Sequence, residues 1–223
     1  MVAKQEETNL GCAISTKGDT VSYSVLTGDL VDSSSLEPAE LTHALETLFT
    51  AFRTIVDWAG DGRYTTHRGD GWQLVAPQEQ YALRYALFIR ASLKAAHPSF
   101  DTRIAIATGH GAIPNDITTA TAPAFIASGR SLDAMHYQFR MAYSQSPEHA
   151  AIAILLDTIA QDWTPTQAGT LLPFLNPTAS PTQKDVANDF GKSRQAISKI
   201  LDAAHYAVIK ETLNLIEGAP SHA

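Results

Sequence analysis

The chain has 223 residues, of which 44% are hydrophobic, which suits one large domain or a medium domain followed by a small one and excludes a disordered protein. No apolar run reaches the roughly 18 residues of a membrane-spanning helix, and the polar N-terminus lacks the apolar core of a secretory signal, so we expect a cytoplasmic protein without a membrane segment. The single cysteine, Cys12, excludes intrachain disulfides, and the net charge of −7 argues against non-specific coating of nucleic acid.

The first two thirds of the chain alternate between strand and helix patterns. Residues 1–19 are expected to form a flexible lead-in. After it, hydrophobic periodicity and turn residues predict strands at 21–26, 63–67, 72–76, 102–108 and 138–143, and helices at 38–58, 78–96 and 124–135. The order is βαββαβ followed by an extra helix, which is the ferredoxin-like arrangement of helices on one face of an antiparallel sheet. The predicted fold class is α+β.

The pattern changes to helices alone after Ser146. Helices are predicted at 147–163, 165–175 and 182–190, and one long helix is predicted from 193 to 216. We therefore place a boundary near residue 146, with a first domain over 20–146 and an all-α domain over 147–218. All of the excess negative charge lies in residues 1–175, so the end of the chain is neutral and can include a small DNA-reading unit.

Two aspartates stand at matching ends of adjacent predicted strands. Asp29 closes the first strand, and Asp70 lies in the tight turn of the central hairpin. Because these strands pair side by side in a ferredoxin-like sheet, the two carboxylates are expected to approach each other and to suit Mg²⁺ or Mn²⁺. The segment Asp32-Ser33-Ser34 then offers hydroxyls and backbone amides to a triphosphate. The alternative is that both aspartates are ordinary turn residues.

Four segments carry a resemblance to a known family. GDLVDSSSL (28–36) and HRGDGWQLV (67–75) resemble the two metal motifs of class III nucleotidyl cyclase domains. TRIAIATGHG (102–111) resembles the strand that follows the second helix, and PAFIASGRSLDAM (123–135) resembles the helix with the catalytic arginine. The whole chain, including Gly69-Asp70-Gly71-Trp72-Gln73, resembles the SatD family, in which a cyclase-like domain precedes a helical DNA-binding tail.

The resemblance assigns roles to individual residues. It implies that Asp29 and Asp70 are the metal pair and that Arg130 stabilises phosphate during catalysis. It puts Thr66 where cyclases carry a base-selecting lysine, and Ile126 where they carry a ribose-orienting asparagine. Loss of one such polar group typically slows catalysis by two to three orders of magnitude, so the resemblance implies nucleotide binding with little turnover. Arg68, beside the hairpin aspartate, is either a phosphate contact or a solvated side chain.

Residues 182–201 have the pattern of a helix-turn-helix. Val186 and Ala187 face inward, Gly191 permits the turn, and Ile197 belongs to the apolar stripe of the second helix. The residues expected to contact bases or phosphates are Thr182, Gln183, Lys192, Ser193, Arg194, Gln195, Ser198 and Lys199. The segment resembles the helix-turn-helix of sigma-region regulators. The alternative is a small helical bundle without a ligand.

Together these features predict a homodimeric DNA-binding transcriptional regulator whose cyclase-like domain binds a nucleotide signal with Mg²⁺ or Mn²⁺. The homodimer is implied by the resemblance, because the active site of that family forms between two subunits. Two alternatives stay open at this stage. One is an active nucleotidyl cyclase with an accessory tail, and the other is a scaffold that uses both folds for protein contacts.

Overall fold

A computed structural model describes residues 22–67 and 69–218, so the predicted lead-in and Arg68 lie outside the described residues. The strands are β1 (Ser22–Leu30), β2 (Arg63–His67), β3 (Gly71–Pro77), β4 (Thr102–His110) and β5 (Met141–Tyr143). The helices are α1 (Pro38–Ala59), α2 (Ala82–Ala96), α3 (Pro123–Asp133), α4 (Pro147–Gln161), α5 (Pro165–Leu171), α6 (Gln183–Asp189), α7 (Arg194–Ala203) and α8 (Tyr206–Glu217). Short 3-10 helices are η1 (Ser33–Ser35), η2 (Glu79–Tyr81) and η3 (Leu172–Leu175).

The five strands form one sheet in the order β2-β3-β1-β4-β5. Strand β1 lies at the centre and pairs antiparallel with β3 and β4, while β5 is added parallel to β4. The observed order of elements matches the predicted βαββαβ sequence through β4, with α3 and β5 following. This mixed fold puts the ends of β1 and the start of β4 side by side, because Asp29 pairs with Arg103.

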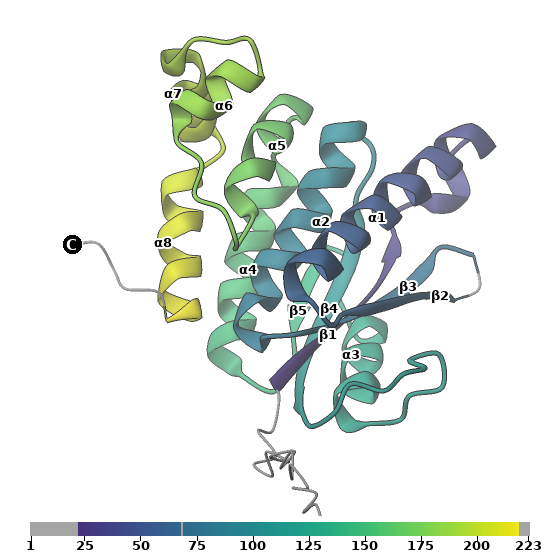
Figure 1. The fold of residues 1–223 in the computed structure, drawn as a ribbon. Helices are drawn as coiled ribbons and strands as arrows, with labels where there is room; N and C mark the ends of the chain where they lie inside the picture. Colours follow the sequence, from purple (N-terminus) through teal and green to yellow (C-terminus); the bar gives the residue numbers. More distant parts are fainter. Residues whose placement is uncertain (1–21, 68, 219–223) are drawn as a thin grey trace, which may run out of the picture.

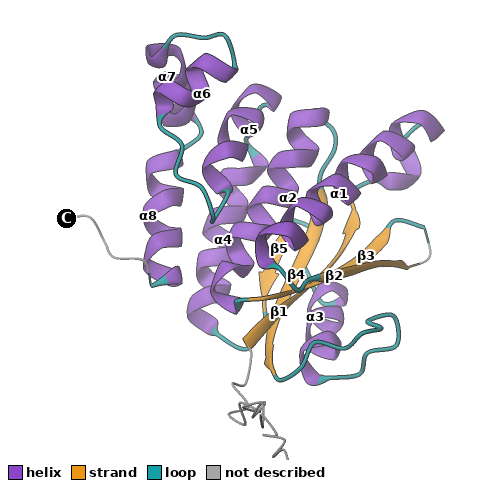
Figure 2. Cartoon of the chain, viewed as in Figure 1, coloured by secondary structure: helices purple, strands orange, loops and turns teal. Residues whose placement is uncertain are grey.

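Helices cover both faces of the sheet, whereas the sequence predicted helices on one face. In Figures 1 and 2, α1 and α2 lie on one side of the sheet and α3 lies on the other. The second face is apolar because alternate strand residues such as Val25, Val75 and Ala107 point toward it, where Phe125 of α3 completes a small core. The prediction of helices on one face was therefore incomplete, because α3 covers a second apolar face of the sheet.

The prediction of one long helix over 193–216 is wrong, because this segment forms two helices, α7 and α8. His205 lies between them with a φ of 57°, in the left-handed region. The break lets Trp163 pack beneath the turn and donate its indole N–H to the carbonyl of Ala204, at 3.2 Å. No glycine or proline marks this break in the sequence, so tertiary packing alone produces it.

Helix α2 joins the two parts of the chain that the sequence separates at residue 146. Twelve of its 15 residues are buried, because α1, α4 and α5 all pack around it. One apolar cluster runs from Leu26 in the sheet, through Leu87 of α2, to Ile197 and Ile209 in the tail. The two parts therefore share a single core. None of the described helices combines the length and the apolar character needed to cross a bilayer.

Candidate functional site

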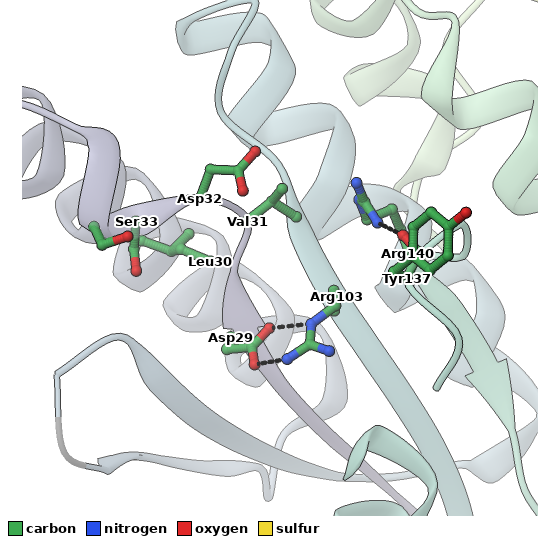
Figure 3. Close-up of a pocket in the computed structure, with 9 residues that line it drawn as sticks. Asp29, Leu30, Val31, Asp32, Ser33, Arg103, Tyr137 and Arg140 are labelled. Carbon is green, nitrogen blue, oxygen red and sulfur yellow. Dashed lines mark hydrogen bonds and ion pairs between the residues drawn. The ribbon is translucent and has the colours of Figure 1, made fainter. Parts of the chain in front are cut away.

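A pocket of about 460 Å³ opens at the C-terminal end of β1 (Figure 3). Its walls come from the end of β1, from η1, from the start of β4 and from the loop before β5. The lining residues are Asp29, Leu30, Val31, Asp32, Ser33, Ser34, Arg103, Tyr137 and Arg140. The volume lies in the range of small-molecule sites, and charged or hydroxyl side chains make up most of the wall.

The floor of the pocket is an ion pair between Asp29 and Arg103 (Figure 3). The guanidinium donates Nε–H to Oδ1 of Asp29 at 2.8 Å and Nη2–H to Oδ2, so both carboxylate oxygens are engaged. This is the two-pronged geometry that an arginine and a carboxylate favour. The pair is half-buried, with exposed side-chain fractions of 33% for the arginine and 25% for the aspartate.

Arg103 is surrounded by carboxylates from three different elements. Its pKa is raised above the ordinary value first by the hydrogen bonds to Asp29, and then, against some desolvation, by the charges of Asp29, Asp133 at the end of α3 and Asp70 in the hairpin turn. The guanidinium therefore stays cationic wherever the protein is folded. Of these three aspartates, Asp29 alone forms hydrogen bonds with Arg103.

The segment after β1 forms one rim of the pocket. Asp32 adopts a left-handed conformation with a φ of 51°, and its carbonyl accepts the backbone N–H of Ser35 at 2.9 Å. Ser33 is half-buried, and both Asp32 and Ser34 are exposed. Val31 donates its N–H to the carbonyl of Asp101 at 2.9 Å, which ties this rim to the start of β4.

The loop before β5 forms the opposite rim. The side chain of Arg140 donates Nη1–H to the carbonyls of Tyr137, at 2.6 Å, and Phe139, at 3.2 Å. Its backbone N–H donates to Oδ2 of Asp157 in α4, at 2.7 Å. Tyr137 is 74% exposed, so its ring stands free at the pocket mouth.

A buried charge network holds both rims in place. Arg90 of α2 is fully buried and donates to both carboxylate oxygens of Asp101, at 2.8 and 2.7 Å, and to Oδ1 of Asp157, at 2.6 Å. Asp101 carries the rim that contains Val31, and Asp157 carries the rim that contains Arg140. Since the network is desolvated and its polar atoms are paired, the separation of the two rims is set rigidly.

The structure brings some predicted residues together and leaves others apart. Asp29, Asp32, Ser33 and Ser34 line one pocket. Asp70 is half-buried in the hairpin turn and acts electrostatically on Arg103, but it is not part of the pocket wall.

Thr66 and Arg130 do not line this pocket, and Arg68 lies outside the described residues. Thr66 is exposed on β2, and Arg130 is exposed on α3. Neither side chain belongs to the pocket wall, and Ile126 is likewise exposed on α3. The nucleotide roles of Thr66, Arg68 and Arg130 therefore stay predictions from the resemblance.

The donor set, as arranged, does not fit a divalent cation. Both oxygens of Asp29 already accept hydrogen bonds from Arg103, so a metal would have to displace that guanidinium. Within the described residues no group of three or more His, Cys, Asp or Glu side chains gathers as metal ligands would. The metal pair of Asp29 and Asp70 therefore stays a prediction, and no chemical step here is routed through a metal.

Three of the pocket residues with polar side chains were not predicted from the sequence: Arg103, Tyr137 and Arg140. The strand that contains Arg103 was found, but its pairing with Asp29 follows only from the β1–β4 register. Tyr137 and Arg140 lie in a segment whose strand was predicted to begin at residue 138, and it begins at 141 instead. The signal that pointed to the site was Asp29 together with the segment Asp32-Ser33-Ser34.

Gln73, which the hairpin motif singled out, has a positioning role. It is buried and donates Nε2–H to Oγ1 of Thr27 at 2.9 Å, and that hydroxyl lies 2.7 Å from Oγ of Ser128 in α3. Through this chain of hydrogen bonds the hairpin and β1 fix the position of α3 on the sheet.

Helices α6 and α7 present the second candidate site. Ser193 caps α7 by accepting the N–H of Ala196 at 3.2 Å, and Gly191 turns the chain with a φ of 60°. Val186, Ala187, Ile197 and Leu201 are buried between the helices, as the spacing predicted. Thr182, Lys192, Ser193, Arg194, Gln195 and Lys199 are exposed, and Gln183 and Ser198 are half-buried. The outer face of α7 is therefore polar and open.

Comparison with known proteins gives likeness in solved structures alone. No family model matches the chain, and no curated protein matches it. A bacterial light-regulated adenylyl cyclase is 21% identical with a TM-score of 0.42, and the match covers 55% of this chain and 75% of that one. The guanylyl cyclase domain of the RhoGC fusion protein from the aquatic fungus Blastocladiella emersonii is 16% identical with a TM-score of 0.44, covering 60% and 84%.

A third similar structure is the guanylyl cyclase Cya2, which is 19% identical with a TM-score of 0.43, covering 60% of this chain and 80% of that one. The three similar structures are thus adenylyl or guanylyl cyclases. At these identities the likeness concerns the fold, and the chemistry of the pocket rests on its own residues.

Proposed function

We propose that the chain is a DNA-binding regulator whose pocket at the end of β1 binds the phosphate groups of a nucleotide. The observation that carries the proposal is the meeting of two arginines, Arg103 and Arg140, with the serine hydroxyls of η1 around one pocket. Arginine donors and hydroxyls are the groups that proteins use to bind phosphate oxygens. Homodimer formation is part of the proposal.

Both arginines keep donors for a ligand. The bonds to Asp29 engage Nε and Nη2 of Arg103, and Nη1 has no partner among the described residues. The bonds to the loop carbonyls use Nη1 of Arg140, which leaves Nε and Nη2 without a partner in the same part of the chain. The pocket wall carries two aspartates and two arginines, so its formal charges cancel, and Arg140 is the arginine that is not paired with an aspartate of the wall.

The first test measures equilibrium binding of ATP and GTP, with and without Mn²⁺, because the exposed carboxylate of Asp32 repels an anion unless a cation accompanies it. Arg103→Met and Arg140→Met are each expected to weaken binding by about tenfold or more, the effect of losing a charge-assisted hydrogen bond. Arg53→Met, an exposed arginine of α1, is the matched control. Unchanged affinity in both pocket variants contradicts the proposal.

Arg130→Met distinguishes the site given by the pocket geometry from the site implied by the resemblance to cyclases. The pocket geometry predicts that its nucleotide affinity equals that of the wild type, whereas the resemblance assigns this arginine to catalysis. Production of a cyclic nucleotide is measured in the same samples.

The tail is proposed to bind DNA through the outer face of α7. Arg194 and Gln195 stand exposed at the start of that helix, where recognition helices contact base edges. Since residues 176–223 carry as many acidic as basic residues, we expect two copies on one symmetric site to be needed for useful affinity.

The test is selection of genomic fragments by the purified protein, with sedimentation to establish the dimer. Arg194→Ala is expected to lose about 1–3 kcal/mol of discrimination between selected and random DNA. Arg53→Ala removes the same charge far from α7 and should bind as the wild type does. Equal binding by wild type and Arg194→Ala contradicts the assignment of the recognition helix.

An active nucleotidyl cyclase is the second candidate. It rests on the resemblance, which implies that Asp29 and Asp70 are the metal pair; a divalent cation would have to displace Arg103 from the oxygens of Asp29. Manganese-dependent formation of a cyclic nucleotide, abolished by Asp70→Asn, would favour this candidate. Nucleotide binding without product favours the regulator.

A further inference from the structure

A second cavity, of about 360 Å³, lies between the sheet unit and the tail and shares no residue with the first pocket. It is enclosed by η2 and the start of α2, by one face of α8, and by the segment 176–181. In Figure 1 this segment runs alongside α8 before it reaches α6. The cavity therefore sits where the helix-turn-helix is anchored to the rest of the molecule.

Three aromatic rings line part of this cavity. The rings of Phe174 and Tyr206 pack with their centroids 4.9 Å apart, and Tyr81 of η2 is the third. Pro177 and Pro181 close the side formed by the linker. The rings and prolines offer contact to a planar ring, and the six polar or charged lining residues suit a ligand that also carries a polar group.

The base of the cavity is a rigid, neutral ion pair. Arg84 donates Nε–H and Nη2–H to the two carboxylate oxygens of Glu217, each at 2.6 Å. The side chains are 10% and 5% exposed, so the two charges compensate each other away from solvent. Of the charged residues that line the cavity, Lys210 is left without an opposite charge.

Polar groups without partners surround the cavity. Lys210 and Asn214 lie one turn apart on α8, and neither side chain has a hydrogen bond or ion pair within the described residues. The hydroxyl of Tyr85 is buried and has no partner among those residues either. Tyr85 is not part of the cavity wall, but its ring centroid lies 6.1 Å from that of Tyr81, which is.

We infer that this cavity binds a small aromatic anion, with the ring between Tyr81 and Tyr206 and the anionic group on Lys210 and Asn214. The ligand would contact the linker 176–181, which leads directly into α6, and α8, which follows α7. Binding is therefore expected to hold the helix-turn-helix more firmly against the sheet unit. This inference goes beyond the proposed nucleotide site and does not depend on it.

The experiment uses the full chain and three aromatic anions as probes: benzoate, indole-3-acetate and phenyl phosphate. Benzamide and indole-3-acetamide are the uncharged counterparts. Binding is measured by ligand-observed NMR and calorimetry, with and without ATP. At least one anion is expected to bind more tightly than its amide, and Lys210→Met is expected to weaken that binding by about tenfold or more.

Two variants locate the binding. Lys184→Met removes an exposed charge from α6 and should bind the anion as the wild type does, because Lys184 is not part of the cavity. Arg103→Met lies in the first pocket and should also leave the anion affinity unchanged. Failure of the nucleotide proposal can therefore be distinguished from failure of this inference. Hydrogen exchange in α6 and α7 should slow when the anion is bound.

Three outcomes would overturn the inference: no anion binds, the anion binds equally to Lys210→Met, or ATP displaces it.

Discussion

Glycine at position 28 allows three strands to meet beside the first pocket. A Cβ there would lie 2.2 Å from the carbonyl oxygen of Arg103 and 2.4 Å from the indole ring of Trp72. The indole passes over Gly28 and donates to Oγ1 of Thr102 at 3.0 Å, and that hydroxyl donates to the carbonyl of Asp29 at 2.6 Å. The backbone of the pocket aspartate is thus held from below by Trp72.

Gly28→Ala is therefore expected to destabilise the protein by about 2 kcal/mol or more, because backbone on one side and a buried ring on the other cannot both move away. Gly129→Ala is the control: no atom lies within 4 Å of the added Cβ in α3, and the helix should gain up to about 1 kcal/mol. Urea denaturation of both variants measures the two effects. A neutral Gly28→Ala would show that the strands can separate there at little cost.

Asp101 is expected to make the stability of the protein depend on pH in the acidic range. Burial opposes its charged form, but the charge and hydrogen bonds of Arg90, helped by Lys94 and the N–H of Thr102, hold the pKa of Asp101 below its ordinary value of 3.8. A carboxyl with a depressed folded pKa contributes stability that is present above pH 3.8 and is lost as the pH falls through the folded pKa.

We expect the free energy of unfolding to fall below about pH 4 in the wild type, and part of that slope to be missing in Asp101→Asn, which is less stable at neutral pH. Denaturation curves at several pH values between about 3 and 7 measure the slope. Asp57→Asn is the control, since Asp57 is exposed on α1 and makes no side-chain hydrogen bond or ion pair among the described residues. Equal acid slopes in Asp101→Asn and the wild type would contradict the role of this carboxyl.

At the residue scale, the sequence identified Asp29 and the Asp-Ser-Ser segment but not the arginines. A carboxylate at the end of a strand is visible as a spacing, whereas the pairing of Arg103 with Asp29 depends on the register of two strands more than 70 positions apart in the chain. Arg140 reaches the pocket only because Asp157, in a helix beyond residue 146, fixes its backbone.

Three elements meet at the buried side chain of Arg90: α2, β4 and α4. Asp157→Ala is expected to destabilise the fold by about 3–5 kcal/mol, because it leaves Nη1 of Arg90 and the N–H of Arg140 without an acceptor in the interior. Asp162→Ala, an exposed position after the same helix, should have an effect within about 0.5 kcal/mol. Urea denaturation of both variants is the measurement.

Asp157→Asn extends that test to the pocket, since it keeps the side-chain shape and one acceptor oxygen. If α4 positions the rim through this network, nucleotide affinity should fall in Asp157→Asn while the protein stays folded. If folded Asp157→Asn binds nucleotide as tightly as the wild type, Asp157 contributes to stability but does not position the pocket.

At the element scale, most strands and helices were predicted to within a few residues, because turn glycines, prolines and apolar periodicity mark their ends. The division between α7 and α8 was not predicted, since no residue in 193–216 breaks a helix by its own preference. His205 adopts its left-handed conformation because Ala204 is held by Trp163. That contact becomes apparent only when α4 and α7 are packed together.

Over the whole molecule, the sheet and the tail are expected to unfold in one step. Helix α2 contributes its buried residues to both parts, so neither part retains a complete core without the other. With 5-fluorotryptophan incorporated, Trp58 and Trp72 report on the sheet side and Trp163 reports on the tail. All three fluorine resonances should change at the same urea concentration. An earlier change at Trp163 would instead indicate a separable tail domain.

The burial of α2 also limits how a signal can travel. Helix α7 packs on α5 and α8, and α5 packs on α2, so α7 is expected to move together with these helices. A ligand can move α7 only by tilting packed helices together, and such shifts are typically about 1–2 Å. In a dimer this is enough, because two recognition helices must match successive major grooves about 34 Å apart, and a few degrees of rotation in each copy changes that match. DNA binding by the proposed dimer would therefore respond to small rotations, because they act over the distance between the two recognition helices.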